Sequence, residues 1–299
     1  MTSYDYAEQF SQVLDEKYKV ALKSDALYRS NPGVQFMNAQ TIKLPVVTTS
    51  GYKDHTRTAG FNAGTLSNSW EPKKLDHDRD IEFFIDPMDI DETNLAMSVA
   101  NITNSFETEQ AIPERDCYTF SKLYADAVEL ASAFNGVLDT EVLTAANILA
   151  KFDAYMEGMD EAGVPEEGRL LYVTPAVNTL VKQAEGIYRH LSAEGGASAV
   201  NRMVHSLDDV EIVSVPSARM KTVYDFTDGC VADSTAKQMN LVLVLPSCVV
   251  ARMRHEYIKL FEPGSDSRTG DGYIYQNRAY WGAFLLNQKT EGLAVNYAA

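Results

Sequence analysis

The stretch from residue 75 to residue 130 constrains the fold most, because it joins a strand pattern to a long helical pattern through a proline. Ile81, Phe83 and Ile85 occupy every second position, a period that predicts a strand with a buried face. Pro87 follows and ends the strand, since proline offers no backbone N–H. The chain therefore has to pass from a sheet directly into a helix at this point.

The helical pattern after Pro87 predicts a long amphipathic helix. Asp89 or Asp91 is placed to cap it. We expect Pro113 to stop or kink this helix and a second helix to cover residues 114–130. The expected apolar positions are Leu95, Val99, Ile102 and Phe106 in the first helix, and Tyr118, Leu123 and Val128 in the second.

Residues 50–80 have a different composition, rich in Gly, Ser and Asn and poor in large apolar side chains. Loops of this length in a compact domain are usually functional or disordered. Ile42, Leu44 and Val46 alternate just before it, and Trp70 lies on its returning side. We therefore predict two strands flanking the tip of an extended loop.

The two ends of the chain also carry patterns. Residues 4–28 have apolar side chains, including Tyr6 and Phe10, at the spacing of an amphipathic helix. A helix of this kind usually packs on its own domain. Near the other end, residues 273–286 and 293–297 read as strands joined by a charged turn, which predicts an aromatic C-terminal hairpin.

The region between these parts alternates between strand and helix patterns. We expect Asp139 or Thr140 to cap a helix containing Val142, Leu143 and Phe152. Thr174-Pro175 has the cap–proline order of a helix start. Apolar runs predict strands at 169–173, 210–215 and 239–245, and we expect a short helix through Val249, Val250 and Met253 after the last of them.

Composition excludes several classes of function. The formal net charge of the 299-residue chain is −16, which disfavours a broad DNA-binding surface. Cys117, Cys230 and Cys248 are far apart in the sequence and form no CxxC pair. We therefore expect reduced thiols and no metal cluster. The N-terminus is polar and acidic, unlike a signal peptide, and the apolar runs are too short to span a bilayer.

No catalytic pattern survives inspection. His255-Glu256 begins an HExxH motif, but Lys259 stands where the second histidine is needed. The acidic residues around His77 alternate along a strand, so their carboxylates do not all converge. We therefore expect no enzyme activity, no cofactor and no metal.

The strand–proline–helix order, the amphipathic N-terminal segment, the sparse loop and the aromatic C-terminal strands together resemble the major capsid proteins of tailed bacteriophages, which have the Hong Kong 97 fold. The resemblance implies an α+β fold with five parts. They are an N-terminal arm (1–44), an extended loop (45–84), a peripheral domain with a spine helix (85–134), an axial domain (135–255), and a peripheral loop with C-terminal strands (256–299).

The resemblance also implies the function. The chain would self-assemble as hexamers and pentamers into an icosahedral head that encloses double-stranded DNA without reading its sequence. It would be built in the host bacterial cytoplasm with a portal and become part of the virion, without a membrane. We expect a separate scaffolding protein rather than a cleaved N-terminal leader. The alternatives are an encapsulin-type nanocompartment shell protein and an α+β enzyme without a recognisable motif.

The candidate site residues are those that the resemblance places between subunits. Mixed charge on the loop suits intersubunit ion pairs, although a solvated surface loop has the same composition and exposed pairs contribute little. The candidates are Tyr6, Phe10, Lys53, Asp54, Arg57, Trp70, Glu71, Lys73, Lys74, Arg79, Glu262, Asp266 and Arg268.

Overall fold

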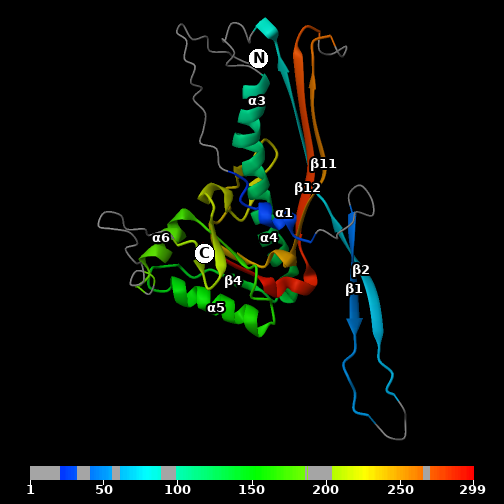
Figure 1. The fold of residues 1–299 in the computed structure, drawn as a ribbon, viewed down its shortest axis with the longest axis vertical. Helices are drawn as coiled ribbons and strands as arrows, with labels where there is room; N and C mark the ends of the chain where they lie inside the picture. The colour runs from blue at the N-terminus through cyan, green and yellow to red at the C-terminus, as the bar shows by residue number, and fades with distance from the viewer. Residues whose placement is uncertain are drawn as a thin grey trace.

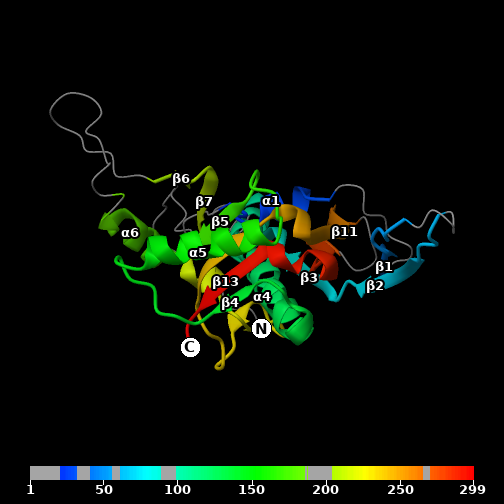
Figure 2. The ribbon, with the colours of Figure 1, turned by 90° about the horizontal axis from the view of Figure 1, so that it is seen from below.

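The computed structural model describes residues 21–31, 41–55, 61–88, 99–185, 187, 204–264 and 270–299. Within them, the body holds a six-stranded sheet and a long three-stranded sheet, and a two-stranded hairpin points away from it (Figure 1). The hairpin and helix α6 lie at opposite ends of the molecule, as the second view also shows (Figure 2). The hairpin strands are β1 (Thr41–Thr49) and β2 (Leu66–Lys74), and a small separate pair is β8 (Tyr224–Asp225) with β9 (Val231–Ala232).

The predicted spine is a nearly continuous helix. Helix α3 (Val99–Phe106) passes through a π-helical segment (Glu107–Ala111) into α4 (Ile112–Leu130). Pro113 thus does not stop the helix, because it lies in the first turn of α4 and the wider π turn precedes it. The expected caps Asp89 and Asp91, Leu95 and the side chain of Val99 lie outside the described residues.

The prediction that Tyr118, Leu123 and Val128 form the apolar side of the second helix is wrong for Val128. Tyr118 and Leu123 are buried, but Val128 is exposed. Steps of five residues advance the helix by roughly 140° beyond a full turn, so three such positions cannot share one face. The residues that do face the body are spaced by three and four, as in Phe120, Leu123 and Ala127.

The six-stranded sheet forms the centre of the body, in the order β4-β13-β10-β5-β7-β6. Its strands alternate between two covered faces, as expected for a period of two. Leu171, Leu241 and Leu243 face the cluster formed with α5 and α6. The elements are β4 (Val137–Asp139), β5 (Leu170–Val173), β6 (Ser206–Leu207), β7 (Val210–Ser214), β10 (Met239–Val244), β13 (Leu293–Tyr297), α5 (Ile148–Glu161) and α6 (Pro175–Gln183).

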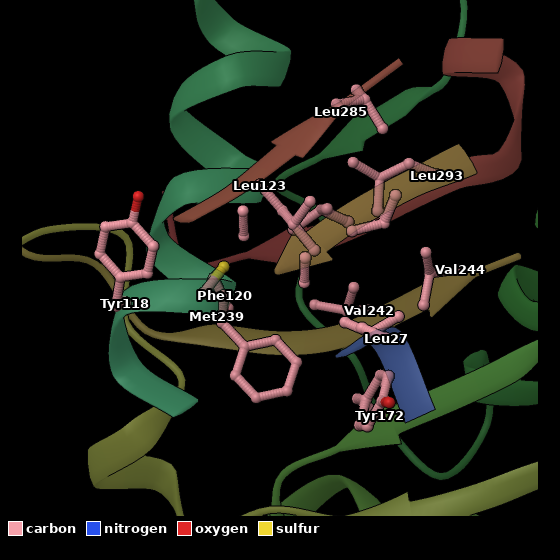
Figure 3. Close-up of a cluster of buried hydrophobic side chains, with 14 of the residues drawn as sticks. Leu27, Tyr118, Phe120, Leu123, Tyr172, Met239, Val242, Val244, Leu285 and Leu293 are labelled. Atoms are coloured by element: carbon pink, nitrogen blue, oxygen red, sulfur yellow. The ribbon is translucent and has the colours of Figure 1, made fainter. Parts of the chain in front are cut away.

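The opposite face of this sheet packs against α4 and forms the larger core (Figure 3). Tyr172 and Val242 from the sheet meet Phe120 from α4, with the Phe120 and Tyr172 ring centroids 5.1 Å apart. Leu27 from the short helix α1 (Asp25–Arg29) completes the cluster. The predicted strands β5, β7 and β10 and the cap of α6, where Thr174 accepts a hydrogen bond from the Val177 N–H, are confirmed.

The three-stranded sheet runs beside the spine in the order β11-β12-β3. Strand β3 (His77–Ile85) pairs antiparallel with β12 (Tyr273–Leu285), which pairs antiparallel with β11 (Val249–Phe261). The helix expected through Val249, Val250 and Met253 is therefore wrong. A short 3-10 turn at Pro246–Cys248 leads straight into β11, whose β-branched residues pair with β12.

The expected aromatic C-terminal hairpin does not form. Strand β12 belongs to the three-stranded sheet, whereas β13 lies between β4 and β10 in the six-stranded sheet. A 3-10 segment (Asn287–Gly292) carries the chain from one sheet to the other. The physical reason is burial: β13 is buried on both faces, so it fits the interior of a covered sheet and not a hairpin with one solvated face.

The helix expected to start at Asp139 begins later. Residues Val137–Asp139 form β4, parallel to β13, and α5 starts after Asn147. Asp139 ends the strand, where its carboxylate accepts a hydrogen bond from the Glu141 N–H at 2.9 Å. Gly136 precedes β4 because a Cβ at that position would collide with the carbonyl oxygens of Leu293 and Thr290.

Candidate functional site

The hairpin of β1 and β2 has no hydrophobic core of its own. Its strands pair from Thr41 opposite Lys74 to Thr49 opposite Leu66. An isolated two-stranded hairpin is at best marginally stable in water. Even so, it exposes large apolar side chains, with Val47 at 61%, Leu66 at 74% and Trp70 at 57% of their full accessible area. Together with Tyr52 and Phe61 at the tip, these form what we call the hairpin surface.

The root of the hairpin is fixed to the body by a small separate core. Ile42 and Leu75 are buried there against Val250, Tyr280 and Phe284. The Tyr280 hydroxyl donates a 2.7 Å hydrogen bond to the Leu75 carbonyl oxygen. The base of the hairpin is thus rigidly attached, while the side chains beyond it face solvent.

A polar triad reinforces this root and accounts for two of the expected interface residues. Lys73 Nζ lies 3.1 Å from Glu71 Oε1 and donates a 3.0 Å hydrogen bond to Asn287 Oδ1. The Asn287 amide also donates to Glu71. Glu71 and Lys73 therefore pair with their own chain, and no local sequence pattern indicates Asn287 as their partner.

Arg79 is likewise used inside the chain. Its Nε lies 2.7 Å from Glu114 Oε1, and its Nη1 donates to the Phe226 carbonyl oxygen at 2.5 Å. His77 Nε2 contacts the same Glu114 oxygen at 3.0 Å. The arginine thus links strand β3, helix α4 and the loop after β8, which indicates a structural role within the subunit.

The other expected interface residues divide by position. Lys53 Nζ donates to the Ala63 carbonyl oxygen at 3.1 Å, and the Asp54 carbonyl oxygen accepts from Asn62 at 2.7 Å, so both stiffen the hairpin tip. Trp70, Lys74 and Glu262 are exposed. Tyr6, Phe10, Arg57, Asp266 and Arg268 lie outside the described residues.

A buried carboxylate fixes the segment that leads to α1. Asp116 on α4 is fully buried and accepts hydrogen bonds from the backbone N–H groups of Lys23 at 3.0 Å and Ser24 at 2.9 Å. The Ser24 hydroxyl at 2.8 Å and Arg219 Nη1 at 2.8 Å complete its partners. Asp116 is not among the expected site residues, because no local pattern distinguishes a buried aspartate on a helix from an exposed one.

A second exposed apolar area lies on the outer half of β11. Tyr257, Ile258 and Leu260 are solvent-exposed there, and β11 is an edge strand of its sheet. Long edge strands present unpaired N–H and C=O groups and are natural sites for contact with another chain. The helix expected through Val249, Val250 and Met253 is not formed, and the β-branched and aromatic residues after Met253 are typical of a strand.

The described residues offer little for catalysis. They contain no group of three or more His, Cys, Asp or Glu side chains placed to hold a metal ion. A cavity of about 580 Å³ lies between β3, the π-helical segment and the loop after β8. Its two arginines are both ion-paired, Arg79 with Glu114 and Arg115 with Glu256. Among the helices of the described ranges, none combines the length and the apolar character needed to cross a membrane.

Comparison with known proteins connects this arrangement to one class of structure. No family model matches the sequence, and no curated protein is similar to it. Solved structures do match, with probability 1.00. The capsid of cyanophage P-SCSP1u superposes with a TM-score of 0.71 and 13% identity, over 98% of this chain and 93% of that one.

Two further matches agree. The mature capsid of bacteriophage PhiM1 gives a TM-score of 0.68 at 14% identity, covering 99% of this chain and 92% of that chain. The capsid of Myoviridae phage XM1 gives 0.58 at 10% identity, covering 98% and 97%. The chain has a phage capsid fold. The mixed helix and sheet architecture expected from the sequence is thereby confirmed. Within this fold, the body leaves the hairpin surface uncovered.

Proposed function

We propose that this chain is the major capsid protein of a tailed bacteriophage, with the Hong Kong 97-like arrangement of parts. Many copies would form hexamers and pentamers that close into an icosahedral head around double-stranded DNA. The observation that carries the proposal is the extent of the capsid-fold match, which takes in nearly all of this chain and nearly all of the matched capsid chain.

The hairpin surface supports assembly as the mechanism. Val47, Leu66 and Trp70 are exposed in the single subunit, and burying each of them against a neighbour contributes roughly 1.5–3 kcal/mol. A hairpin that is marginal alone becomes stable when a neighbouring copy covers it, so folding of this element and assembly are coupled. The firmly held root fixes the direction in which the hairpin meets that neighbour.

The division into parts follows the same proposal. The hairpin over residues 41–74 would be the extended loop, and α3 with α4 beside β3, β11 and β12 would be the peripheral domain. The six-stranded sheet with α5 and α6 would be the axial domain, to which β13 also contributes. The expected arm (1–44) would run into the first residues of β1, and the peripheral loop at residues 261–272 would complete the contacts around each subunit.

The partners follow from the role. We expect a separate scaffolding protein, a portal, and no membrane, with the head built in the host cytoplasm and the chain ending in the virion. The net charge of −16 suits a wall that encloses DNA without adhering to it. We expect a structural role without catalysis, because the solved structures that match this chain are capsids.

The deciding experiment is co-expression of the chain with the scaffolding protein of its phage, followed by electron microscopy and light scattering. We expect closed icosahedral shells. A stable monomer under every assembly condition contradicts the proposal, and so does a native particle that contains a cargo enzyme and no DNA.

A pair of variants separates the function from its mechanism. Leu66→Ala combined with Trp70→Ala should fold normally yet reduce shell yield at least tenfold, because each lost contact is worth more than 1.4 kcal/mol. Val142→Ala changes an equally exposed apolar residue on the body and serves as the matched control. Equal shell yields from the wild type and the double variant would be consistent with a capsid protein, but they would show that these hairpin side chains are not needed for assembly.

A further inference from the structure

The two faces of the hairpin differ in what they meet within their own chain. Residues directly opposite each other in an antiparallel pair project to the same face, so the register of β1 and β2 assigns each side chain to one face. One face carries Ile42, Glu71 and Lys73, which are held against the body at the root. The opposite face, which we call the tryptophan face, is exposed. It consists of Lys43, Pro45, Val47, Thr49, Leu66, Asn68, Trp70, Pro72 and Lys74.

Both outer edges of the hairpin are interrupted by a proline. Pro45 lies in β1 opposite Trp70, and Pro72 lies in β2 opposite Lys43. Proline has no N–H, so within a ladder it is tolerated where its nitrogen points away from the paired strand. A third strand added at either edge would lack a donor at that point. The edges therefore disfavour an added strand, which leaves the tryptophan face as the surface for a partner.

The tryptophan face is apolar at its centre and positively charged near the root. Pro45 and Trp70 lie opposite each other, and Val47 is the next residue on the same face. Lys43 and Lys74 are the two charged side chains of this face, which carries no carboxylate and has a formal charge of +2 in a chain of net charge −16. A matching surface should therefore combine exposed apolar side chains with carboxylates.

The outer face of the three-stranded sheet offers this combination. Phe84 on β3 is 55% exposed and Tyr257 on β11 is 38% exposed. Asp80 and Glu82 lie on the same face as Phe84, because side chains alternate along β3. A hollow of about 600 Å³ lies on this face, and its lining includes Asp80, Glu82, Tyr257 and Arg278. The hollow gives an aromatic side chain a place to be buried beside carboxylates.

Cations on this outer face are already engaged. Arg278 donates two hydrogen bonds to Asp78, at 3.0 and 2.6 Å. Lys259 Nζ lies 4.4 Å from the centroid of an aromatic ring on its own strand. The carboxylates along β3 outnumber these two cations, since Asp78 is followed on the same face by Asp80 and Glu82. The β3 side of this face is therefore negative, as the lysines of the tryptophan face require.

The two surfaces are too far apart to meet within one chain. The hairpin and the far ends of β11 and β12 point in opposite directions along the longest axis of the molecule (Figure 1). The hairpin root is fixed by its own core and by the Glu71–Lys73–Asn287 contacts, so it cannot turn round. A contact between two different patches on identical molecules is heterologous, and such contacts generate rings when the rotation between copies closes.

We propose that the tryptophan face of one copy binds the outer face of the three-stranded sheet of a second copy. Trp70 enters the hollow, and Lys43 and Lys74 lie beside Asp80 and Glu82. A buried aromatic side chain surrounded by charge pairs is the usual anatomy of an energetically important contact. This inference rests on the proposed function, and it adds which face of the hairpin is used and which surface of the second copy receives it.

The first test cross-links wild-type shells with a carbodiimide, which condenses a lysine amine and a carboxylate in direct contact into an amide with loss of water. We expect peptides that join Lys43 or Lys74 to Asp80 or Glu82, identified by mass spectrometry and absent from the unassembled chain. Shells built from a mixture of unlabelled and heavy-nitrogen-labelled chains should give links of mixed isotope, because each link joins two copies.

The outcomes separate this contact from the function. Shells in which neither lysine is linked to Asp80 or Glu82 would overturn the contact and leave the capsid role intact. The same links formed in the unassembled chain would also overturn it, because they would lie within one molecule. A chain that stays monomeric and unlinked under every assembly condition would contradict both proposals.

A matched pair of variants tests the choice of face. Asn68 and Ser69 are adjacent, polar and exposed on β2, and they project to opposite faces. Asn68→Glu should reduce shell yield at least about tenfold, because it brings a negative charge to Asp80 and Glu82. Ser69→Glu should remain within about twofold of wild type. Circular dichroism of the unassembled chains checks that both variants fold.

Charge reversal completes the test. Asp80→Lys combined with Asn68→Glu should recover shell yield relative to Asn68→Glu alone, because the repelling pair becomes an attracting one. Equal yields from Asn68→Glu and Ser69→Glu, or no recovery in the combined variant, would overturn the proposed contact.

Discussion

The hairpin of β1 and β2 is antiparallel throughout and the six-stranded sheet is antiparallel in part, yet the two differ in how they bury their apolar side chains. From Leu241 to Val244, alternate side chains point to opposite faces of the sheet, and each is buried in one of the two clusters that cover those faces. In the hairpin, by contrast, Val47 and Leu66 have no cover from the described part of the chain. The body therefore buries its apolar side chains within one chain, whereas the hairpin leaves several of its own exposed.

The largest effect is expected at the buried carboxylate of the body. Asp116→Ala should lower the free energy of unfolding of the unassembled chain by about 3–5 kcal/mol, because it leaves the Arg219 charge and two backbone N–H groups without their acceptor. Urea unfolding followed by circular dichroism measures this. Asp116→Asn keeps the shape and one acceptor oxygen and should cost less. A loss below 1 kcal/mol for the alanine variant would mean that the site is solvated.

The apolar centre of the body should respond almost as strongly. Leu243→Ala removes a fully buried side chain between α5 and the sheet and should cost about 2–5 kcal/mol. Leu243→Met conserves volume and should cost less than about 1.5 kcal/mol in the same urea titration. Equal losses for the two variants would contradict a tightly packed centre.

A smaller, pH-dependent effect is expected on the exposed side of the three-stranded sheet. Two hydrogen bonds from Arg278, at 3.0 and 2.6 Å, lower the pKa of Asp78. A lowered folded-state pKa stabilises the fold above the unfolded pKa of about 3.9, and this contribution is lost as the pH falls through the folded value.

Asp78→Asn tests this contribution by calorimetry at two pH values. The variant should lower the thermal midpoint by no more than about 3 °C at pH 7, since the pair is exposed to solvent. The difference from wild type should shrink as the pH falls through the folded-state pKa of Asp78. A difference that is the same at both pH values would show that charge is not involved.

The smallest effect on the unassembled chain is expected in the hairpin. Leu66→Ala is the same chemical change as Leu243→Ala, but it should alter the free energy of unfolding by less than about 0.5 kcal/mol, because the side chain is already in water. Urea titrations of Leu66→Ala and Leu243→Ala in parallel compare the same truncation at an exposed and at a buried position. A loss above 1 kcal/mol at Leu66 would mean that the free subunit folds the hairpin back onto itself.

Sequence patterns sufficed where local chemistry decides the structure. Local sequence alone predicts three features correctly. They are the apolar strands β5 and β10, the end of β3 before a proline, and the start of α6 at Thr174-Pro175. The hairpin was likewise visible as a break in composition between two strand patterns.

Patterns failed where a distant partner decides. Residues 137–139 became a strand because β13 lies beside them, and 249–253 became a strand because β12 does. The same limit applied to the site. Glu71 and Lys73 looked free for a neighbour, and only the folded chain brings Asn287 to them.

The position of β13 has a consequence for the order of events during synthesis. This strand joins β4 to β10, yet the ribosome makes it after both, and β3 must wait in the same way for β12. Neither sheet can close before its late strand has been synthesised. Long-range pairings of this kind form slowly and late. A chain truncated before Leu293 lacks the strand that joins β4 to β10, so its six-stranded sheet cannot form completely. Complete folding of this sheet therefore requires synthesis through Tyr297.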